Sequence, residues 1–296
     1  MIHFLFTIFS IFLFTSTGLA QDFSKVSIKT TKVSKNLYML EGKGGNIGAV
    51  AGKEGVYIID DQFAPLYDKI TAALKKLSDQ PVKFVINTHW HGDHTGGNEK
   101  FGKSGSVIVA HENVRKRMSK KNFTKIFNRE TPAAAKAALP VVTFPDKMSI
   151  HLNGVEAKIM HFKNAHTDGD SVIYFPSLNA FHTGDIFFNG FYPYIDVDAG
   201  GSLKGIIAAV TKILSMSNSR TKIIPGHGPL ASKKDLEIYL KMLTQVNSKM
   251  AKLVKDGKTV EQIVEMKPLS SLDEKWGKGF MKPEVFTKLT YQSLKK

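Results

Sequence analysis

Three histidines and one aspartate occur within six residues, directly after a short apolar stretch, and this run constrains the chain more than any other feature. The run reads His89-Trp90-His91-Gly92-Asp93-His94, and it follows the apolar stretch Val82–Asn87. A metal site needs several nitrogen or carboxylate ligands held in a rigid frame. A strand that ends in a tight glycine turn can supply that frame. The sequence therefore predicts a metal site at the end of a buried strand.

The order of residues within this run predicts two metal positions. Alternate side chains of an extended segment point the same way, so His89 and His91 can share one metal. Gly92 lets the chain bend, and Asp93 and His94 then face a second metal. A single histidine is more often a surface or core residue, but four such residues at this spacing are a specific signal.

The hydrophobic pattern around the run alternates between strands and helices. Strands recur in both halves of the chain with a helical segment closing each half, which predicts two sheets packed face to face between helices. Residues 113–136 are predicted to be a basic, helix-prone insertion. The predicted strands are residues 26–30, 37–41, 48–52, 55–61, 82–87, 107–110, 147–152, 155–161, 171–175, 180–182 and 222–225, and the predicted helices are 65–78, 203–215, 233–255, 260–265 and 283–294.

Four further motifs accompany the histidine run, and together the five resemble the signature of the metallo-β-lactamase superfamily. The resemblance covers roughly residues 30–230, and the order of the motifs matches. It implies an α/β fold, a four-layer αββα sandwich of two packed mixed sheets flanked by helices, with C-terminal helices added. The five motifs are Asp60-Asp61, Thr88-His-Trp-His-Gly-Asp-His94-Thr-Gly-Gly97, Asn164-Ala-His166-Thr-Asp-Gly-Asp170, His182-Thr-Gly-Asp185 and Pro225-Gly-His227-Gly.

The resemblance implies an enzyme with two Zn²⁺ ions, although other divalent metals are compatible with the same ligands. Two ions about 3.5–4 Å apart share a bridging water and turn it into hydroxide near neutral pH, and this hydroxide attacks a carbonyl. Asp93 and Asp185 are the implied catalytic carboxylates. The implied metal ligands are His89, His91 and His166 for one ion, Asp93, His94 and His227 for the other, and Asp185 as the bridge.

Two supporting roles are also implied by the resemblance. Asp60 or Asp61, at the end of a predicted strand, corresponds to a buried aspartate that steadies the histidine loop; a simple strand-end turn is the alternative. His182 is expected to be a hydrogen-bonding partner rather than a ligand.

The motifs define a metal-dependent hydrolase but leave its substrate open. The leading hypothesis is hydrolysis of a cyclic amide or ester, a β-lactam or a lactone. The alternatives are a glyoxalase II-like thioesterase, a phosphodiesterase or nuclease, and an iron-dependent oxygenase on the same fold. True metallo-β-lactamases have cysteine or serine where Asp185 stands, and the basic glutathione-contacting residue of glyoxalase II is missing from the segment 190–194. An aromatic-rich run, 187–194, favours an amphipathic small-molecule substrate.

The N-terminus predicts export. Residues 1–20 contain no Asp, Glu, Lys or Arg, and their apolar stretch is about eleven residues, too short for a spanning helix. Gly18 and Ala20 fit a signal-peptidase site, so we expect a signal peptide at 1–20, a hydrolase domain at 21–230 and a helical extension at 231–296. The mature protein would be periplasmic or secreted, with no stable membrane association; an uncleaved membrane anchor is the alternative. The oligomeric state is left open.

The net charge of +15 does not by itself indicate a nucleic-acid partner. The 41 Lys and Arg residues are scattered, and no basic run is interleaved with aromatic residues as a nucleic-acid platform requires. A solvated lysine-rich surface is expected, with no nucleic-acid partner.

Overall fold

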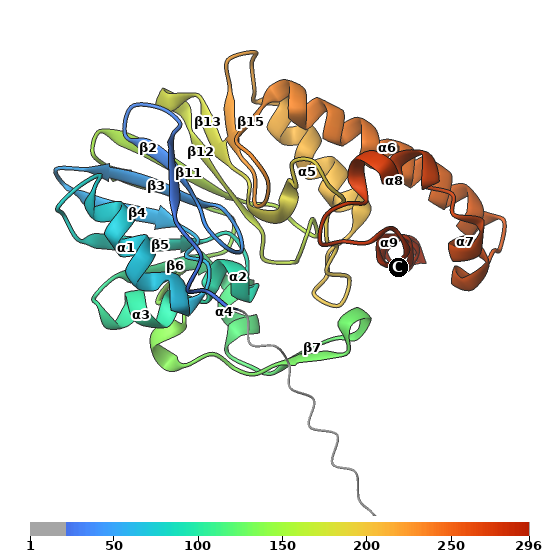
Figure 1. The fold of residues 1–296 in the computed structure, drawn as a ribbon, viewed down its shortest axis with the longest axis horizontal. Coiled ribbons are helices and arrows are strands. Elements are labelled where there is room, and N and C mark those ends of the chain that lie inside the picture. The colour runs from blue at the N-terminus through green and yellow to red at the C-terminus, as the bar shows by residue number, and fades with distance from the viewer. Residues whose placement is uncertain (1–21, 296) are drawn as a thin grey trace, which may run out of the picture.

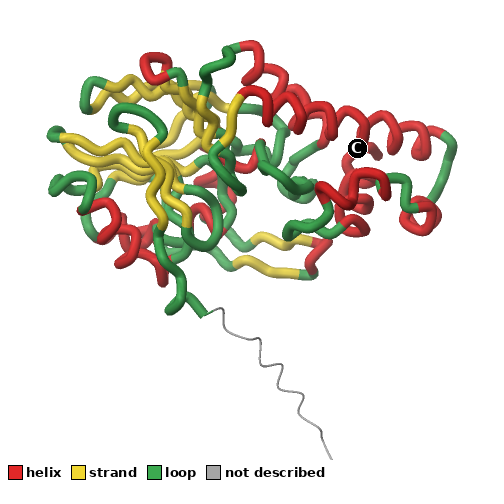
Figure 2. Tube along the Cα trace, turned by 45° about the horizontal axis from the view of Figure 1, so that its top comes forward, coloured by secondary structure: helices red, strands yellow, loops and turns green. Residues whose placement is uncertain are grey.

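Two β-sheets packed face to face form the centre of the computed structural model, which describes residues 22–295 (Figure 1). Helices cover the outer face of each sheet, so the predicted four-layer αββα sandwich is confirmed. Figure 2 shows the strands of the two main sheets gathered in one half of the molecule and the C-terminal helices in the other. The predicted signal peptide lies outside the described residues.

The first sheet is mixed and has seven strands in the order β1-β2-β3-β4-β5-β6-β9. Strands β1 to β4 are antiparallel neighbours, whereas β4, β5, β6 and β9 run parallel. The strands are β1 (Lys29–Lys32), β2 (Leu37–Glu41), β3 (Ile47–Gly52), β4 (Gly55–Ile59), β5 (Val82–Asn87), β6 (Val107–His111) and β9 (Val142–Phe144).

The second sheet is also mixed and has six strands in the order β10-β11-β12-β13-β14-β15. All neighbours are antiparallel except β13 and β14. The predicted turn at Asn153-Gly154 joins β10 to β11, and both residues have positive φ, as a two-residue hairpin turn requires. The strands are β10 (Lys147–Leu152), β11 (Val155–His161), β12 (Ser171–Phe175), β13 (Ala180–His182), β14 (Lys222–Ile224) and β15 (Ala231–Ser232).

The helices begin and end where local chemistry favours it. The longest, α6, starts at a capping box in which Ser232 and Asp235 satisfy each other's backbone amides. The short helices over residues 92–95, 98–103 and 270–276 were not predicted. The helices are α1 (Tyr67–Lys75), α2 (Gly92–Thr95), α3 (Asn98–Lys103), α4 (Glu112–Met118), α5 (Leu203–Ser215), α6 (Lys233–Lys255), α7 (Val260–Met266), α8 (Ser270–Trp276) and α9 (Pro283–Lys295).

Strand β4 shows how the layers are held together. Its side chains alternate between the two faces of the sheet. Tyr57 and Ile59 pack between the sheets, while Val56 and Ile58 pack in the cluster that also contains residues of α1 and α3. All four are fully buried. A strand buried on both faces reads as a continuous apolar run, which is why β4 was predicted as a strand.

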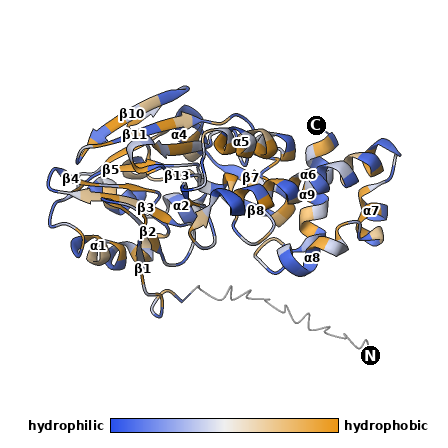
Figure 3. Cartoon of the chain, turned by 90° about the horizontal axis from the view of Figure 1, so that it is seen from above, coloured by the Kyte–Doolittle hydropathy of each residue, from blue (hydrophilic) through white to orange (hydrophobic). Residues whose placement is uncertain are grey.

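The C-terminal helices share a core with the second sheet. Leu236 and Leu243 of α6 belong to the same buried cluster as Ile206 of α5 and Phe181 of β13. Colouring by hydropathy shows apolar residues along the helices of this half (Figure 3). The boundary between a hydrolase domain and an extension near residue 230 stays a prediction. Within residues 22–295, no helix combines the length and the apolar character needed to cross a membrane.

The prediction of a helix-prone segment over residues 113–136 was wrong beyond Met118. Helix α4 ends there, and a hairpin of β7 (Asn122–Thr124) and β8 (Arg129–Thr131) follows. Asn122 Nδ2 donates to the carbonyl oxygens of Arg117 and Lys120, which caps the end of the helix. Asn128 takes a left-handed conformation at the hairpin tip, a conformation that asparagine tolerates better than most residues.

Candidate metal centre

The predicted ligands lie in loops that follow strands β5, β11, β13 and β14. Strand β5 runs parallel to β4, and β13 runs parallel to β14, so within each sheet these strands end at the same edge. Loops after parallel strands are where α/β proteins gather functional residues. The seven ligand residues form two groups, His89, His91, His166 and Asp185 in the first and Asp93, His94 and His227 in the second.

Three imidazole nitrogens of the first group converge on one point. His91 Nδ1 lies 3.1 Å from His89 Nε2 and 2.9 Å from His166 Nε2. Asp185 Oδ2 is 3.7 Å from His89 Nε2 and 3.6 Å from His166 Nε2. His89 and His166 are almost fully buried.

The second group has two imidazoles and a carboxylate. His94 Nε2 lies 3.3 Å from His227 Nε2, and Asp93 Oδ2 lies 3.3 Å from His227 Nε2 and 3.7 Å from His94 Nε2. Asp93 and His227 keep 29% and 21% of their side chains exposed, whereas His94 is buried. This group is therefore open to solvent on the side of Asp93 and His227.

Asp185 joins the two groups. Its Oδ2 faces the first group, while its Oδ1 lies 3.0 Å from His94 Nε2 and 3.4 Å from His227 Nε2. The residue sits in a short 3₁₀ turn, Gly184–Ile186, directly after β13. This is the position that a bridging carboxylate would need.

The donor set fits metal ions. Ligands about 2.0–2.1 Å from a tetrahedral zinc lie about 3.3 Å from one another, close to the separations in both groups. Two neutral imidazole nitrogens that both point lone pairs at one spot repel each other unless a cation or a proton lies between them. Asp185 Oδ1 is buried and makes no hydrogen bond among the described residues, although His94 Nε2 is near. Both features are expected of atoms that bind a cation.

The electrostatics of the groups also favour cations. Burial lowers the pKa of His89 well below its usual value and that of His166 to about 4, so both rings are neutral and offer lone pairs. Burial alone would lower the pKa of His94 and of His227, but the negative charges of Asp185 and Asp93 outweigh it. The pKa of His94 is therefore raised well above its usual value and that of His227 to about 9. A cation entering the second group would therefore displace protons.

Asp60 is the aspartate whose side chain contacts a ligand ring of the histidine loop. Asp60 Oδ2 lies 2.7 Å from His94 Nδ1 and accepts a hydrogen bond from Thr88 Oγ1, and Asp60 Oδ1 accepts from Thr88 N. With Nδ1 occupied in this way, His94 presents Nε2 to the second group. Asp61 accepts a hydrogen bond from Gly97 N instead. Both aspartates are buried.

Two further supports were not predicted from the sequence. Asp196 Oδ2 lies 2.8 Å from His91 Nε2, and the carbonyl oxygen of Tyr194 lies 2.8 Å from His166 Nδ1. Each contact leaves the other ring nitrogen facing the first group. His182 plays the predicted hydrogen-bonding part: its Nε2 lies 3.1 Å from the carbonyl oxygen of Asn46, and it is in neither ligand group.

Two glycines allow the backbone to approach the ligands closely. A Cβ at Gly45 would lie 2.1 Å from His94 Cε1, and a Cβ at Gly226 would lie 2.1 Å from Asp185 Oδ1. The two loops are tied together, because Asn46 N donates to the carbonyl oxygen of Gly226 at 2.7 Å. No side chain larger than hydrogen fits at either position without displacing a ligand.

The family model of the metallo-beta-lactamase superfamily matches residues 40–227, the span that contains both groups. The chain belongs to the metallo-β-lactamase superfamily. Several members that the chain resembles are hydrolases.

Relatives within the superfamily have diverse activities. The chain is 21% identical over 256 residues to a linear primary-alkylsulfatase of Pseudomonas sp., covering 73% of this chain and 48% of the relative. It is 28% identical over 165 residues to a hydroxyacylglutathione hydrolase of Nitrosococcus oceani, covering 55% of each. The chain thus spans about half the length of these curated relatives. A metallo-beta-lactamase from Pontibacter korlensis has the same fold, with a TM-score of 0.60 and 21% identity over 74% of this chain and 99% of that one.

The aromatic run after Asp185 divides between the core and the metal centre of this superfamily member. Phe187 and Tyr192 are fully buried and pack on residues of α6 and α9. The ring of Phe188 stacks on His227, with centroids 5.1 Å apart, and the ring of Tyr194 lies beside His91 and His166.

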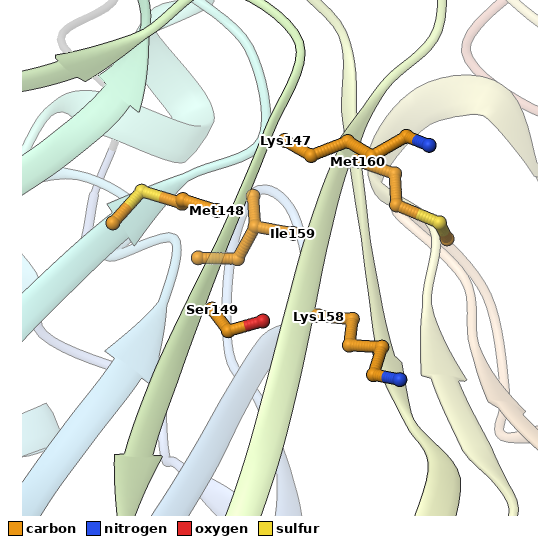
Figure 4. Close-up of a pocket in the computed structure, with 6 residues that line it drawn as sticks. All are labelled: Lys147, Met148, Ser149, Lys158, Ile159 and Met160. Atoms are coloured by element: carbon orange, nitrogen blue, oxygen red, sulfur yellow. The ribbon is translucent and has the colours of Figure 1, made fainter.

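A hollow of about 380 Å³ lies away from the ligand groups, on the hairpin of β10 and β11 (Figure 4). Its lining includes two lysines and one serine but none of the metal-centre residues. It holds no acid, histidine or activated nucleophile, so it is not the active site. Its six lining residues are Lys147, Met148, Ser149, Lys158, Ile159 and Met160.

Proposed function

We propose that the chain is an exported dinuclear zinc hydrolase that opens a cyclic amide or ester, a β-lactam or a lactone. The observation that carries this proposal is the shared carboxylate: Asp185 faces three histidines with one oxygen and two histidines with the other. Histidine nitrogens with carboxylate oxygens are a ligand set that suits zinc.

When bound, two such ions would activate a shared water and polarise the carbonyl oxygen of the substrate. The residues of the chain position this chemistry. Burial alone would raise the pKa of Asp93, but the charges of His94 and His227 hold it below its usual range. Asp93 is therefore ionised and partly exposed, and it can accept a hydrogen bond from the attacking water and orient it. Asp185 is held ionised in the same way, mainly by His94 against the effect of burial.

The test is a metal analysis combined with a substrate panel. The protein from Gln21 onward is loaded with zinc, and nitrocefin, simple lactones and S-lactoylglutathione are assayed before and after chelation. We expect about two zinc ions per chain and chelator-sensitive turnover of a β-lactam or lactone. Asp185→Ala should lose at least one ion and most of the activity. Absence of turnover on the ring substrates by the zinc-loaded protein would refute the proposed substrate class. Iron binding with oxygen consumption would refute the hydrolytic assignment.

A thioesterase of the glyoxalase II type is the second candidate. It is supported by the 28% identity to a hydroxyacylglutathione hydrolase. Turnover of S-lactoylglutathione at least a hundredfold above that of the lactones would favour it.

Export is the part of the proposal that rests on the sequence alone. It is supported by the uncharged, apolar residues 1–20. N-terminal sequencing of the protein recovered from a periplasmic extract should begin at Gln21. Recovery of the full-length chain in the cytoplasmic fraction would contradict it.

A further inference from the structure

A row of aromatic rings leads outward from the first ligand group. The ring of Tyr194 lies 5.4 Å from that of His91, measured between centroids. Phe127 lies 5.3 Å beyond Tyr194, and Phe280 lies 5.8 Å beyond Phe127. The three aromatic residues come from three separate segments: the β7–β8 hairpin, the loop before α5 and the loop between α8 and α9.

A second row leads outward from His227 in the other group and ends in the same place. Phe188 stacks on His227, and Phe191 lies 5.9 Å beyond Phe188. Phe191 packs against Gly279, where an added Cβ would lie 2.6 Å from Phe191 Cβ. Both rows therefore meet at the segment Gly279-Phe280.

The outer rings are exposed although the inner ones are buried. Tyr194 is 9% exposed, whereas Phe127 is 39% and Phe280 is 73% exposed. Single exposed apolar residues are common on protein surfaces. Here, however, two exposed rings contact each other and connect to metal-centre histidines through a third ring. Apolar surface at such a place is typical of a binding site for an apolar group.

The hairpin is held in position by polar contacts at its tip. Lys125 N donates to Asp198 Oδ2 at 2.8 Å. Asp198 lies in the loop before α5, the same loop that carries Tyr194. Phe127 follows in the short 3₁₀ turn Lys125–Phe127, which Asn128 closes. Figures 1 and 2 show the hairpin reaching from the first half of the chain towards the C-terminal helices. The position of Phe127 next to Phe280 is therefore built into the fold.

We propose that Tyr194, Phe127 and Phe280 bind an unbranched alkyl chain of the substrate while its reacting carbonyl lies at the metal centre. This inference rests on the proposed hydrolase function and narrows it to amphipathic substrates. An apolar group laid along these rings leaves water and covers the exposed faces of Phe127 and Phe280. Each methylene that is fully covered should strengthen binding by about fourfold.

The first test measures lactone hydrolysis as a function of chain length. The zinc-loaded protein is assayed with γ-butyrolactone, γ-octalactone and γ-dodecalactone. We expect kcat/KM to rise with chain length, mainly through KM. Phe127→Ala and Phe280→Ala should each reduce the preference for the dodecalactone over the butyrolactone by about tenfold. Phe280→Leu, which keeps an apolar side chain, should retain most of the preference.

Phe123 provides a matched control on the same hairpin. It is 50% exposed, and within residues 22–295 its ring contacts no other aromatic ring. Phe123→Ala should leave the chain-length preference unchanged. An equal loss of preference in Phe123→Ala and Phe280→Ala, or no preference in the unsubstituted protein, would overturn the inference.

The second test is independent of turnover, so it separates failure of this inference from failure of the proposed function. Binding of dodecanoate and acetate to the zinc-loaded protein is measured by calorimetry. Dodecanoate should bind at least a hundredfold more tightly than acetate, and Phe127→Ala should remove most of that difference. If dodecanoate binds in this way but no lactone is hydrolysed, the proposed substrate class fails and the apolar binding surface stands. If Phe280→Ala converts a dimer into a monomer without changing the dodecanoate-to-acetate ratio, the rings are a subunit contact and the inference falls.

Discussion

Replacing Asp196 by asparagine should weaken the first metal group and leave the second intact. Both oxygens of the Asp196 side chain accept a hydrogen bond. Oδ2 lies 2.8 Å from His91 Nε2, and Oδ1 accepts from Ala199 N at 3.0 Å. Asp196 is only 1% exposed, so bulk water does not replace a lost bond. The carboxylate therefore holds His91 with its Nδ1 directed at the first group.

An asparagine at this position cannot satisfy both donors. If its carbonyl oxygen faces His91, its amide group faces Ala199 N, and two donors oppose each other. If the asparagine amide is rotated the other way, its NH₂ group faces His91 Nε2, which must then accept a hydrogen bond. The imidazole must in that case carry its proton on Nδ1, the atom that should bind the metal. Loss of such a supporting contact costs about 10- to 100-fold in metal affinity, or about 1.4–2.7 kcal/mol.

The assay is a competition titration of zinc against a chromophoric chelator. We expect one of two dissociation constants to rise by about 10- to 100-fold in Asp196→Asn while the other changes less than threefold. Combining the substitution with Asp93→Ala, which removes a ligand of the second group, assigns the affected constant to the first. Asp198→Asn is the matched control, because Asp198 lies in the same loop and bonds to Lys125 N rather than to a ligand. Unchanged zinc affinity in Asp196→Asn would refute this account of how His91 is positioned.

Three further predictions concern stability. Zinc at a hundredfold excess over its dissociation constant should raise the Tm by about 5–10 °C per site, measured by calorimetry, and an unchanged Tm would contradict metal binding to the folded state. Leu243→Ala should lower the free energy of unfolding, measured in urea, by about 2–5 kcal/mol, because Leu243 is fully buried in the core shared by α5 and α6. Lys241, which is exposed on the same helix, is the control. An equal effect of Lys241→Ala would contradict this prediction. Burial raises the pKa of Asp170 to about 8, although hydrogen bonds from Thr167 oppose this shift. Between about pH 4 and pH 8 the folded state therefore keeps a proton on Asp170 that the unfolded chain releases. The metal-free protein should lose stability as the pH rises through this range. Asp170→Asn should lack this loss, and urea titrations at pH 5 and pH 9 that give both proteins the same pH dependence would refute it.

The sequence predicted those parts of the fold in which local pattern alone decides the structure. The bounds of β5, β10, β11, β12, β13, α5 and α6 agree with the predicted ranges. Each is an apolar or amphipathic run ended by turn residues or by a cap. The β7–β8 hairpin was missed because its three-residue strands are too short to show a period, while its lysines and arginines favour a helix. Tertiary contacts, such as that of Lys125 N with Asp198, decide its structure.

The same distinction applies to the metal centre. The spacing of His89 to His94 could assign ligands to two groups because neighbouring residues on a bent segment have fixed relative directions. No such rule links His91 to Asp196, which lies 105 positions further along the chain, and Asp196 belongs to no motif. Asp196 and Asp198 are two positions apart, yet Asp196 contacts His91 and Asp198 contacts Lys125 N. Only the fold determines which of the two aspartates lies next to His91.

The residues proposed to contact the apolar part of the substrate lie still further from any local signal. Tyr194, Phe127 and Phe280 are aromatic residues in irregular segments, where sequence alone does not distinguish a core residue from a surface one. Phe187 and Tyr192, in the same run as Tyr194, are indeed core residues. The ligands occupy loops that follow strands of both sheets, whereas the contact between the outer rings depends on the β7–β8 hairpin and the loop between α8 and α9. Substitutions of Phe127 or Phe280 can therefore change which substrate is bound while leaving the geometry of the metal ligands intact. Selectivity for the substrate and affinity for the metal can thus be altered separately.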